Sequence, residues 1–587
     1  MTDKKLNLIL CWHMHQPDYR NLTSGEYMLP WTYLHAMKDY TDMAYHLESH
    51  SKARAVFNFV PVLLDQLEDY SRQFEEGRLL DPLLKLLAEE DLNNLSPDRR
   101  KLVFDSCFRS NHTKMIDPYP PYRRLWDLFN HQEPFGAVGL DYLSGQYLSD
   151  LLVWYHLVWC GETVRRNHEL VVNLMTKGSH FTLADRRDLL ALIGRLIREL
   201  IPRYRKLADD GQIEISTTPH CHPIVPLLID FKVARECMPG VSLPEAAYYP
   251  GGLKRASFHI DSAIDSHRAR FGVAPQGIWP AEGGVSQAAA LVFAEHGCRW
   301  MASGEAVLVN SLRGLDGSKT LPARMDYLYR PYRIATGERE IVSFFRDDKL
   351  SDRIGFEYAK WFGKDAVDNF IHALEEIWRC TPAGENPVVS VILDGENAWE
   401  YYPYNGYYFL SEMYEALESH PFIRTTTFKD YLDGHVGQNG MQAQLPLELA
   451  GIAGADPVAA ELPYLVAGSW VYGTFSTWIG SPDKNRAWDM LCAAKQSFDL
   501  VVASGRLSAE EIEHAHLQLA DCEGSDWFWW FGDYNPQHSV ESFDKLYREN
   551  LANLYSLLKL PVPEELGKPI SHGGGNPEAG GAMRRAS

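Results

Sequence analysis

The stretch Val388-Val-Ser-Val-Ile-Leu-Asp394-Gly-Glu396-Asn397 joins an apolar, β-branched run to two acids. Such a run is typical of a buried strand, and its acids stand where the strand would end. A second stretch of this kind is Trp279-Pro-Ala-Glu282-Gly, which follows the apolar run at 276–279. Because a parallel sheet gathers the C-terminal ends of distant strands at one edge, we expect Glu282 and Asp394 to face each other across a cleft. Two facing carboxylates suit the cleavage of a sugar linkage.

Strands of this type recur along the chain. Seven apolar runs predict them, at about 6–12, 54–60, 212–216, 276–279, 298–302, 341–345 and 388–393. The segments between these runs show helical spacing, as at Leu189, Ile193, Leu196 and Leu200. This alternation indicates βα units around a parallel sheet, so we expect an α/β fold. Seven units suit either a barrel or a doubly wound sheet.

Two long regions carry helical patterns without strand signals. The interval 61–211 is expected to form a helical insertion, and such insertions often roof a cleft. Beyond about residue 405 helices dominate again, and one of them opens with the capping-box pattern Ser508-Ala-Glu-Glu511. We therefore expect a catalytic domain over 1–405 and a C-terminal helical domain over 406–565. The apolar content of 566–587 is too low for folding, so this end is expected to be a disordered tail.

The composition excludes several classes of partner. A formal net charge of -21 without a basic block argues against nucleic acid. No apolar run approaches the length of a membrane span, and the apolar stretch near the start is too short for a signal peptide. The nine cysteines are scattered and never spaced as CxxC, which indicates reduced thiols. We expect a cytoplasmic protein that binds neither nucleic acid nor membrane, and the sequence leaves its oligomeric state open.

Two pairs of histidines lie near predicted strand ends. His13 and His15 alternate along one strand and therefore share a face, and His220 and His222 follow the strand at 212–216. With a carboxylate nearby, these pairs could bind zinc; the alternatives are hydrogen bonds to substrate hydroxyls or burial in the core. No Asp or Cys stands at an obvious ligand spacing, so we expect no metal and no other cofactor.

Aromatic and basic side chains accompany the two acids. Trp399 belongs to an aromatic belt that follows Asp394, and Trp470 lies in the helical C-terminal region. Either ring could stack on a sugar or pack in the core. Arg346 follows the predicted strand 341–345, so it belongs to the same sheet edge, where ion pairs that hold the rim explain it best.

In these residues the chain resembles glycoside hydrolase family 57, in its α-amylase and amylopullulanase branch. The resemblance covers nearly the whole chain and rests on four motifs in order: His15-Gln16-Pro17, Gly211-Gln-Ile-Glu214 continuing to His222-Pro223, Trp279-Pro-Ala-Glu282-Gly, and Leu393-Asp394-Gly395-Glu396-Asn397. The stretch from Trp470 to Trp478 approximates a fifth motif, and Glu523-Gly-Ser-Asp-Trp527 looks like another segment of this branch. One departure is Ala302-Ser-Gly304-Glu305, where many relatives carry Asp-Glu.

The resemblance implies an incomplete (β/α)7 barrel with a helical insertion, followed by a C-terminal α-helical domain. It also implies a retaining glycoside hydrolase that acts on α-glucans such as starch, glycogen and maltooligosaccharides, and on pullulan as a further candidate. Glu282 would be the nucleophile and Asp394 the general acid/base, with Glu396 in a supporting role. The side chains expected to line the sugar site are His13, His15, Gln16, Glu214, His222, Trp279, Arg346, Trp399 and Trp470.

Two alternative activities remain open. On the same fold, an acceptor sugar could replace water, which would make the protein a 4-α-glucanotransferase or a glucan branching enzyme. A zinc-dependent α-mannosidase-like hydrolase, which resembles this family in its barrel, would instead use the paired histidines. A glucan sensor without turnover is disfavoured because both acids are present.

Overall fold

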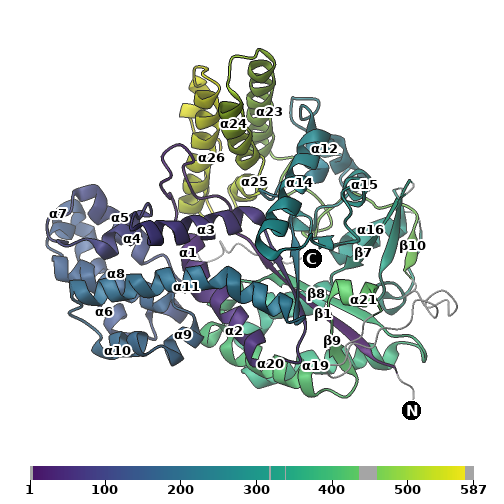
Figure 1. The fold of residues 1–587 in the computed structure, drawn as a ribbon, viewed down its shortest axis with the longest axis horizontal. Coiled ribbons are helices and arrows are strands. Elements are labelled where there is room, and N and C mark those ends of the chain that lie inside the picture. Colours follow the sequence, from purple (N-terminus) through teal and green to yellow (C-terminus); the bar gives the residue numbers. More distant parts are fainter. Residues whose placement is uncertain (1–3, 316, 318, 338, 435–458, 576–587) are drawn as a thin grey trace.

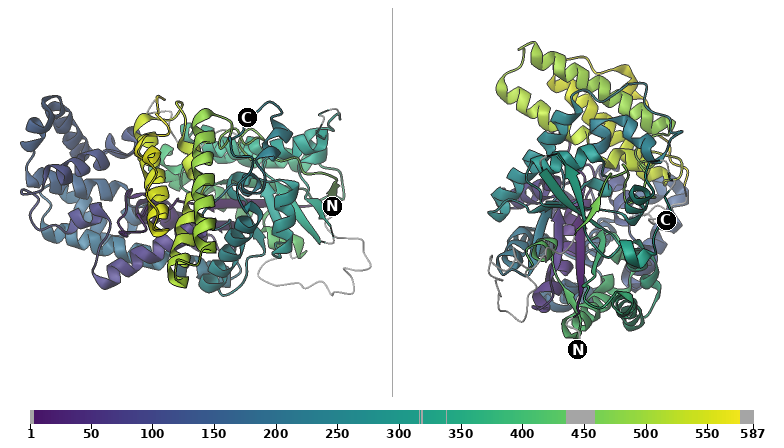
Figure 2. Two further views of the ribbon diagram at one scale, coloured as in Figure 1. Left: turned by 90° about the horizontal axis from the view of Figure 1, so that it is seen from above. Right: turned by 90° about the vertical axis from the view of Figure 1, so that its right-hand side faces the viewer.

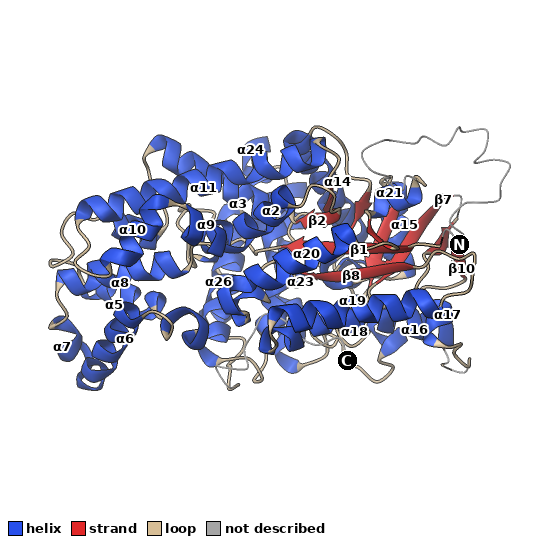
Figure 3. Ribbon diagram, turned by 90° about the horizontal axis from the view of Figure 1, so that it is seen from below, coloured by secondary structure: helices blue, strands red, loops and turns tan. Residues whose placement is uncertain are grey.

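The computed structural model describes residues 4–315, 317, 319–337, 339–434 and 459–575. All seven strands that the sequence predicts are present and lie in one sheet, on one side of the molecule (Figure 3). These strands are β1 (Leu6–Met14), β2 (Ala55–Phe59), β3 (Ile213–Thr217), β4 (Gly277–Ile278), β5 (Trp300–Ser303), β7 (Arg339–Phe345) and β8 (Val388–Asp394). They pair in parallel in the order β7-β5-β4-β3-β2-β1-β8, which confirms the α/β class.

The two ends of this strand order meet. Arg346, directly after β7, forms an isolated parallel bridge with Ser390 of β8. The backbone N–H of Asp347 donates to the carbonyl oxygen of Ser390 at 2.8 Å. The seven strands therefore curl into a barrel that closes near their C-terminal ends, as the incomplete (β/α)7 prediction requires.

Three short strands at the margins of the sheet were not predicted. They are β6 (Tyr332–Thr336), β9 (Ile423–Thr425) and β10 (Ala460–Leu462). β6 pairs antiparallel with β7, β10 adds to β6, and β9 pairs with β1. Such short runs show neither a sustained alternation nor a continuous apolar stretch, so the sequence pattern does not reveal them.

Alternation along the strands decides what faces the barrel interior. An apolar cluster fills it: Ile9, Cys11, Val56, Trp300, Ala302, Phe344, Val388 and Ile392, with Phe428 of α21 (Phe428–Leu432) packed against them. Successive side chains point to opposite faces, so His13, Asn58 and Asp394, two residues beyond Cys11, Val56 and Ile392, continue the inward series. The barrel is thus apolar at its base and polar at the C-terminal mouth.

Helices cover the outside of the barrel. Residues such as Leu8 and Leu10 of β1 point outward and belong to a large buried cluster that includes these helices. The covering helices are α1 (Trp31–His35), α2 (Thr41–Ser49), α12 (Val225–Ile229), α14 (Gly252–Phe271), α15 (Gln287–Glu295), α16 (Glu305–Arg313), α19 (Gly363–Cys380) and α20 (Tyr407–Ser419).

The chain between β2 and β3 is helical, as predicted, and forms a lobe beside the barrel (Figure 1). α3 (Pro61–Glu76) leads into the lobe and the long α11 (Leu183–Asp209) leads back to β3. The helices between them are α4 (Pro82–Ala88), α5 (Pro97–Cys107), α6 (Pro120–Gln132), α7 (Gly136–Asp141), α8 (Gly145–Val158), α9 (Glu162–Asn167) and α10 (Glu169–Lys177). None of the helices within the described ranges has the length and apolar character needed to cross a membrane.

A second group of helices stands on the barrel near its mouth (Figures 1 and 2). It consists of α23 (Pro482–Ala503), α24 (Ala509–Cys522), α25 (Asp526–Trp530) and α26 (Gln537–Leu557). The capping box predicted for α24 is present: the Ser508 hydroxyl accepts the Glu511 N–H at 3.2 Å, and the Glu511 carboxylate accepts the Ser508 N–H at 2.8 Å. A C-terminal helical region therefore follows the barrel, as predicted.

The prediction of a disordered tail from residue 566 is wrong for residues 566–575. Leu566, Ile570 and Ser571 are buried against the C-terminal helices. The buried carboxylate of Asp544 in α26 accepts the backbone N–H groups of Ile570 and Ser571 at 2.7 and 3.2 Å. These contacts satisfy the backbone of a segment whose composition alone gives no folding signal. Residues 576–587 lie outside the described part of the chain.

Candidate active site

Three inward-facing polar residues form one layer at the barrel mouth. His13 of β1 is the register partner of Asn58 in β2 on one side and of Asp394 in β8 on the other. Neighbouring strands lie about 4.8 Å apart, so the register alone places these residues side by side. Asn58 was not predicted as a site residue; its signal is a polar side chain inside the apolar run 54–60.

Hydrogen bonds fix the tautomer of His13. The Asn58 amide nitrogen donates to Ser216 Oγ at 3.0 Å, and its Oδ1 accepts from Thr218 Oγ1 at 2.8 Å. In this orientation Asn58 Oδ1, 2.6 Å from His13 Nδ1, accepts a hydrogen from that nitrogen. Burial, with a smaller contribution from the nearby His15, lowers the pKa of His13 to about 3. His13 is therefore a neutral imidazole whose Nε2 is an acceptor.

The two other histidines of the cluster pack directly against it. His222 Nε2 lies 3.2 Å from His13 Nε2, and the rings of His15 and His222 stack with their centroids 3.8 Å apart. His222 has a left-handed backbone (φ 60) and is buried, and burial lowers its pKa well below the usual value. The predicted partner His220 turns away and pairs with Asp65 at 2.8 Å.

The C-terminal helices contribute two side chains to this cluster. Asp526 at the start of α25 places its carboxylate oxygens 2.9 and 3.0 Å from His15 Nε2. Ser525 Oγ lies 2.8 Å from His222 Nδ1, and the Ser525 N–H donates to the His222 carbonyl at 3.0 Å. Sequence reasoning missed both residues, although they lie within the quoted segment Glu523-Gly-Ser-Asp-Trp527.

The donor set His15, His222 and Asp526 is the one place among the described residues where three such groups come within 4.8 Å of one another. As arranged, however, the Nε2 atoms of His15 and His222 are held by hydrogen bonds, whereas His15 Nδ1 is buried without a partner in the part of the chain that the structure describes. His15 Nε2 faces both oxygens of a carboxylate, and His222 Nε2 faces the acceptor nitrogen of His13, so both nitrogens carry hydrogens. Coordination would require both to lose them. The expectation that this site works without a metal stays a prediction.

Asp394 ends β8 in a position suited to a proton donor. Burial raises the pKa of its carboxyl to about 6, although the hydrogen bond from Asn397 at 3.1 Å and the charges of His15 and Arg346 oppose the rise. A carboxyl with this pKa is half protonated near pH 6 and keeps its proton in about a tenth of the molecules at pH 7, far more often than an ordinary aspartate.

Glu282 stands on the loop after β4 in a strained backbone conformation. Its φ of 57° and ψ of 25° are left-handed, which costs about 1–3 kcal/mol for a residue other than glycine. Two hydrogen bonds from Trp470 hold it there: the backbone N–H donates to the Glu282 carbonyl at 3.0 Å, and the indole N–H donates to Oε2 at 2.9 Å. The Ser303 hydroxyl fixes the neighbouring Gly283 carbonyl at 2.6 Å.

Arg346 links the surroundings of the two acids. Its guanidinium lies over the Trp470 ring, 5.4 Å from the centroid, and its charge lowers the pKa of Asp394. Asp348 and Asp352 each accept from it at 2.8 Å. Arg346 therefore forms the expected rim ion pairs, acts on the charge of Asp394, and packs on the Trp470 ring whose indole donates to Glu282.

Glu396 lies buried behind Asp394. Its Oε1 accepts from the His15 backbone N–H and from the Gln16 amide, both at 3.4 Å. Burial, followed by the charge of Asp394, raises the pKa of Glu396 well above its usual value. The supporting role that the resemblance implies for Glu396 fits this place, because a raised pKa makes a carboxyl a weaker candidate for nucleophile.

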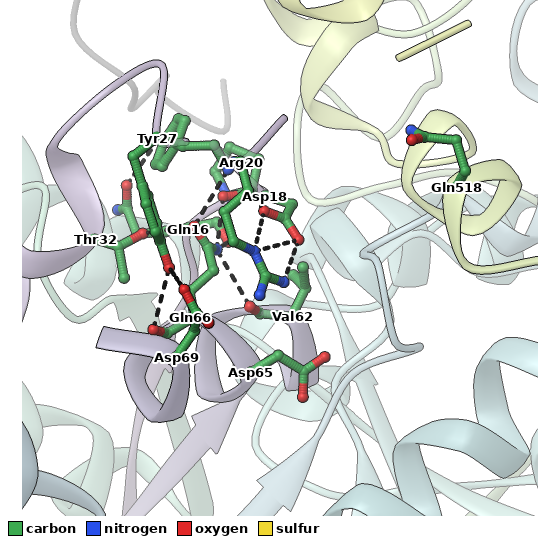
Figure 4. A network of polar contacts seen from close by, with 12 residues as sticks. Gln16, Asp18, Arg20, Tyr27, Thr32, Val62, Asp65, Gln66, Asp69 and Gln518 are labelled. Carbon is green, nitrogen blue, oxygen red and sulfur yellow. Dashed lines mark hydrogen bonds and ion pairs between the residues drawn. The ribbon is translucent and has the colours of Figure 1, made fainter. Parts of the chain in front are cut away.

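The loop that carries His15 and Gln16 is anchored on α3 (Figure 4). Gln66 of α3 donates to the Pro17 carbonyl at 2.8 Å and accepts from Thr32 at 3.0 Å. The Tyr19 hydroxyl donates to Gln16 Oε1 at 2.8 Å. The first helix of the insertion thus holds the first motif in position.

Three predicted sugar-contact residues are buried or lie deeper in the barrel, and of these Trp279 reaches the cluster. Glu214 lies near the start of β3, far from its C-terminal end, and accepts from the Trp300 indole at 2.8 Å and the Lys429 N–H at 2.9 Å. Trp399 is buried and donates to the Gly395 carbonyl at 2.8 Å. Trp279 is also buried, with its ring centroid 6.2 Å from that of His13 and 5.2 Å from that of Trp470. The prediction that these residues contact sugar stays a prediction.

A buried carboxylate fixes the segment that supplies Ser525 and Asp526. Glu523 accepts hydrogen bonds from Tyr249, from Arg255 at 2.7 and 2.8 Å, and from His259 at 2.8 Å. Burial alone would raise its pKa, but the charge of Arg255 and the hydrogen bond from His259 hold it at about 2. The His259 carbonyl also accepts the His220 N–H at 3.0 Å. Glu523 therefore ties α14 to both loops around the histidine cluster.

We expect Glu523→Gln to lower kcat by about 10²-fold, because a displacement on the order of 1 Å in a positioning segment has that effect. The free energy of unfolding should fall by about 3–5 kcal/mol, since Arg255 loses its buried counter-charge. Asp544→Asn is the matched control: it also neutralises a buried, ion-paired carboxylate of the C-terminal helices, but one without contacts to the histidines. It should lose stability and keep kcat. Equal losses of kcat in both variants would contradict a positioning role.

The chain was also compared with known proteins. Residues 9–447 match the model for glycosyl hydrolase family 57. The chain belongs to glycosyl hydrolase family 57. It is therefore an enzyme that acts on glycosidic bonds. No curated protein sequence matches it significantly.

Solved structures share the fold of this family 57 chain. A GH57 branching enzyme from Thermococcus kodakaraensis has a TM-score of 0.55 at 15% identity, covering 94% of this chain and 90% of that one. A GH57-type branching enzyme from Pyrococcus horikoshii gives 0.54 at 16% identity, covering 96% and 93%. The α-amylase AmyC from Thermotoga maritima gives 0.51 at 14% identity, covering 96% and 95%. At these identities the likeness establishes the fold.

Proposed function

We propose that this family 57 enzyme cleaves α-glucans with retention of configuration, with Glu282 as nucleophile and Asp394 as general acid/base. The observation that carries the proposal is the contrast between the two acids. Asp394 is half-buried with a raised pKa, whereas Glu282 accepts an indole hydrogen bond that suits an ionised carboxylate. The choice of α-glucans draws support from the branching enzymes and the α-amylase that share the fold.

In the first step, a Glu282 oxygen attacks the anomeric carbon while Asp394 gives its proton to the leaving glycosidic oxygen. The C–O bond to the leaving sugar breaks and a glycosyl ester of Glu282 forms. Retaining enzymes hold their two carboxyl groups about 5–5.5 Å apart for this purpose.

In the second step, Asp394 is ionised and takes a proton from water as the water oxygen attacks the anomeric carbon. The ester bond breaks, Glu282 leaves as a carboxylate, and the product keeps its original configuration. Esterification of Glu282 removes a negative charge from the site, which favours the ionised Asp394 that this step needs.

The histidine cluster supports a sugar-binding role. Imidazole nitrogens donate and accept hydrogen bonds, as sugar hydroxyls require, and the low pKa of His13 keeps that ring neutral. We infer that His13, His15 and His222 bind hydroxyl groups of the sugar whose bond is cleaved.

The test is incubation with amylose, pullulan and maltoheptaose, with products resolved by linkage and by anomer. Hydrolysis with initial release of α-anomers would support the proposal, and β-anomers or lack of turnover would contradict it. Products longer than maltoheptaose would assign transfer, and new branch points in amylose would assign branching. Dialysis against a chelator should leave the rate unchanged. A loss of rate that added zinc restores would support the alternative in which the histidine cluster binds a metal.

A further inference from the structure

A cavity of about 250 Å³ lies between the helical insertion and the loop that follows Asp394. The insertion contributes Tyr119, just before α6, and Arg165 of α9, and the loop contributes Trp399, Glu400 and Asn405. The lining includes none of Glu282, Asp394 and the three clustered histidines. This cavity is therefore separate from the side chains that are proposed to react with or bind the cleaved sugar.

The rim of this cavity has an unusual backbone. Tyr404 and Asn405 both have a φ of 53°, and Gly406 follows with a φ of 74°. Buried polar groups hold this conformation: Asn405 Oδ1 accepts from Lys38 Nζ at 3.0 Å, and its amide donates to Asp42 at 2.9 Å. Left-handed conformations outside glycine persist only where the surroundings enforce them, and they concentrate at functional positions.

This backbone presents aromatic rings to solvent at the rim. The side chains of Tyr404 and Tyr408 are 57% and 44% exposed. The Arg166 guanidinium lies 5.7, 4.5 and 5.0 Å from the ring centroids of Tyr404, Tyr407 and Tyr408, and it donates to the Tyr408 hydroxyl at 3.1 Å. Tyrosine rings that are held in place and yet exposed are suited to stacking on the apolar face of a sugar.

The buried charges in the cavity are paired. Lys38 pairs with Asp39 at 2.7 Å, and Arg165 pairs with Glu162 at 2.7 Å and donates to the Val158 carbonyl at 2.9 Å. These two cations are therefore already neutralised, which weakens the attraction for a phosphate and leaves the half-buried Lys114 as the remaining cation of the lining. Glu400 adds a carboxyl group that accepts from hydroxyls.

We propose that this cavity binds a glucose residue of an α-glucan chain at a distance from the bond being cleaved, with Tyr404 as stacking platform and Glu400 as hydroxyl acceptor. The proposal rests on the proposed function for the substrate class. The indole of Trp399, which lines the cavity, donates to the Gly395 carbonyl at 2.8 Å, directly after Asp394. A chain held in the cavity is thereby oriented relative to the catalytic acid.

The experiment separates binding from turnover. In a Glu282→Gln background, maltoheptaose binding is measured by calorimetry with and without Tyr404→Ala or Glu400→Gln. Each added substitution should raise the Kd about tenfold, which corresponds to about 1.4 kcal/mol. Tyr142→Ala is the matched control, because Tyr142 is an 82% exposed tyrosine of the insertion outside the cavity, and it should leave the Kd unchanged. In the active enzyme, Tyr404→Ala should lower kcat/KM for maltoheptaose and spare maltotriose.

The possible failures are distinguishable. If the wild-type enzyme turns over α-glucans but neither cavity variant changes the Kd, the cavity proposal is overturned and the proposed function stands. If the variants weaken maltoheptaose binding but the wild type cleaves no α-glucan, the proposed function fails and the cavity remains a glucan site. Glucose 1-phosphate binding that exceeds maltoheptaose binding, and that Glu400→Gln strengthens, would overturn the assignment to a neutral sugar.

Discussion

The Glu282→Gln enzyme is expected to lose turnover of α-glucans by about 10⁴-fold or more, as enzymes do when the nucleophile is removed. An amide oxygen is a poor nucleophile, so the glycosyl ester does not form. The fold should survive, because the Gln side chain still accepts the Trp470 indole hydrogen bond. Rates on maltoheptaose and the melting temperature are the measurements. Substantial residual cleavage would remove Glu282 from the nucleophile role.

Glu396→Gln is the matched control for this experiment. Glu396 is a second buried acid of the site, and its raised pKa favours the neutral carboxyl, whose charge and shape the amide reproduces. We expect its rate to stay within about tenfold of wild type, the loss of a single hydrogen bond of about 1.4 kcal/mol at most. A Glu396→Gln loss as large as that of Glu282→Gln would mean that the catalytic acids have been misassigned.

The Asp394→Asn enzyme is expected to lose about 10²–10⁴-fold in rate, the usual contribution of a general acid/base. The deficit should shrink for a nitrophenyl glycoside, because its leaving group needs no proton in the first step. In an Asp394→Ala variant, added azide should restore turnover, since azide attacks the glycosyl ester without a general base. A full deficit on the nitrophenyl substrate, without azide rescue, would exclude this role for Asp394.

The pH dependence follows from the same carboxyl group. Asp394 must be protonated for the first step and its pKa is about 6, so kcat/KM should fall as the pH rises through that value. The Asn397 hydrogen bond lowers this pKa, so Asn397→Ala should move the alkaline limb to higher pH. A limb that stays in place would show that another group controls it.

The sequence patterns predict the barrel well because its strands are continuous apolar runs that end in polar residues. The alternation of Ile9, Cys11 and His13, and the place of Asp394 at the end of such a run, suffice to put His13 and Asp394 at the barrel mouth. The family resemblance added the roles of Glu282 as nucleophile and Asp394 as general acid/base. These inferences rest on local periodicity, which a single sequence carries.

Other parts of the site depend on contacts between distant segments. Asp526 reaches His15 only because Glu523 and Arg255 fix the C-terminal helices on α14, and no local pattern encodes that docking. The depth of Glu214 in the barrel is likewise invisible in its motif, which identifies the residue but not its neighbours. The packing of Ile570 depends on one carboxylate in another helix.

The closure of the barrel has a consequence for the acid. β1 and β8 pair along the length of β8, whereas β7 meets β8 at the isolated bridge between Arg346 and Ser390. The barrel therefore has a seam between β7 and β8 that this bridge closes at one end. Arg346 follows β7 on one side of this seam, and Asp394 ends β8 on the other side. Among the barrel strands, backbone amide hydrogen exchange should be fastest along the seam between β7 and β8. The seam thus sets the positive charge of Arg346 beside the proposed proton donor, and this charge opposes the rise in the pKa of Asp394 that burial causes.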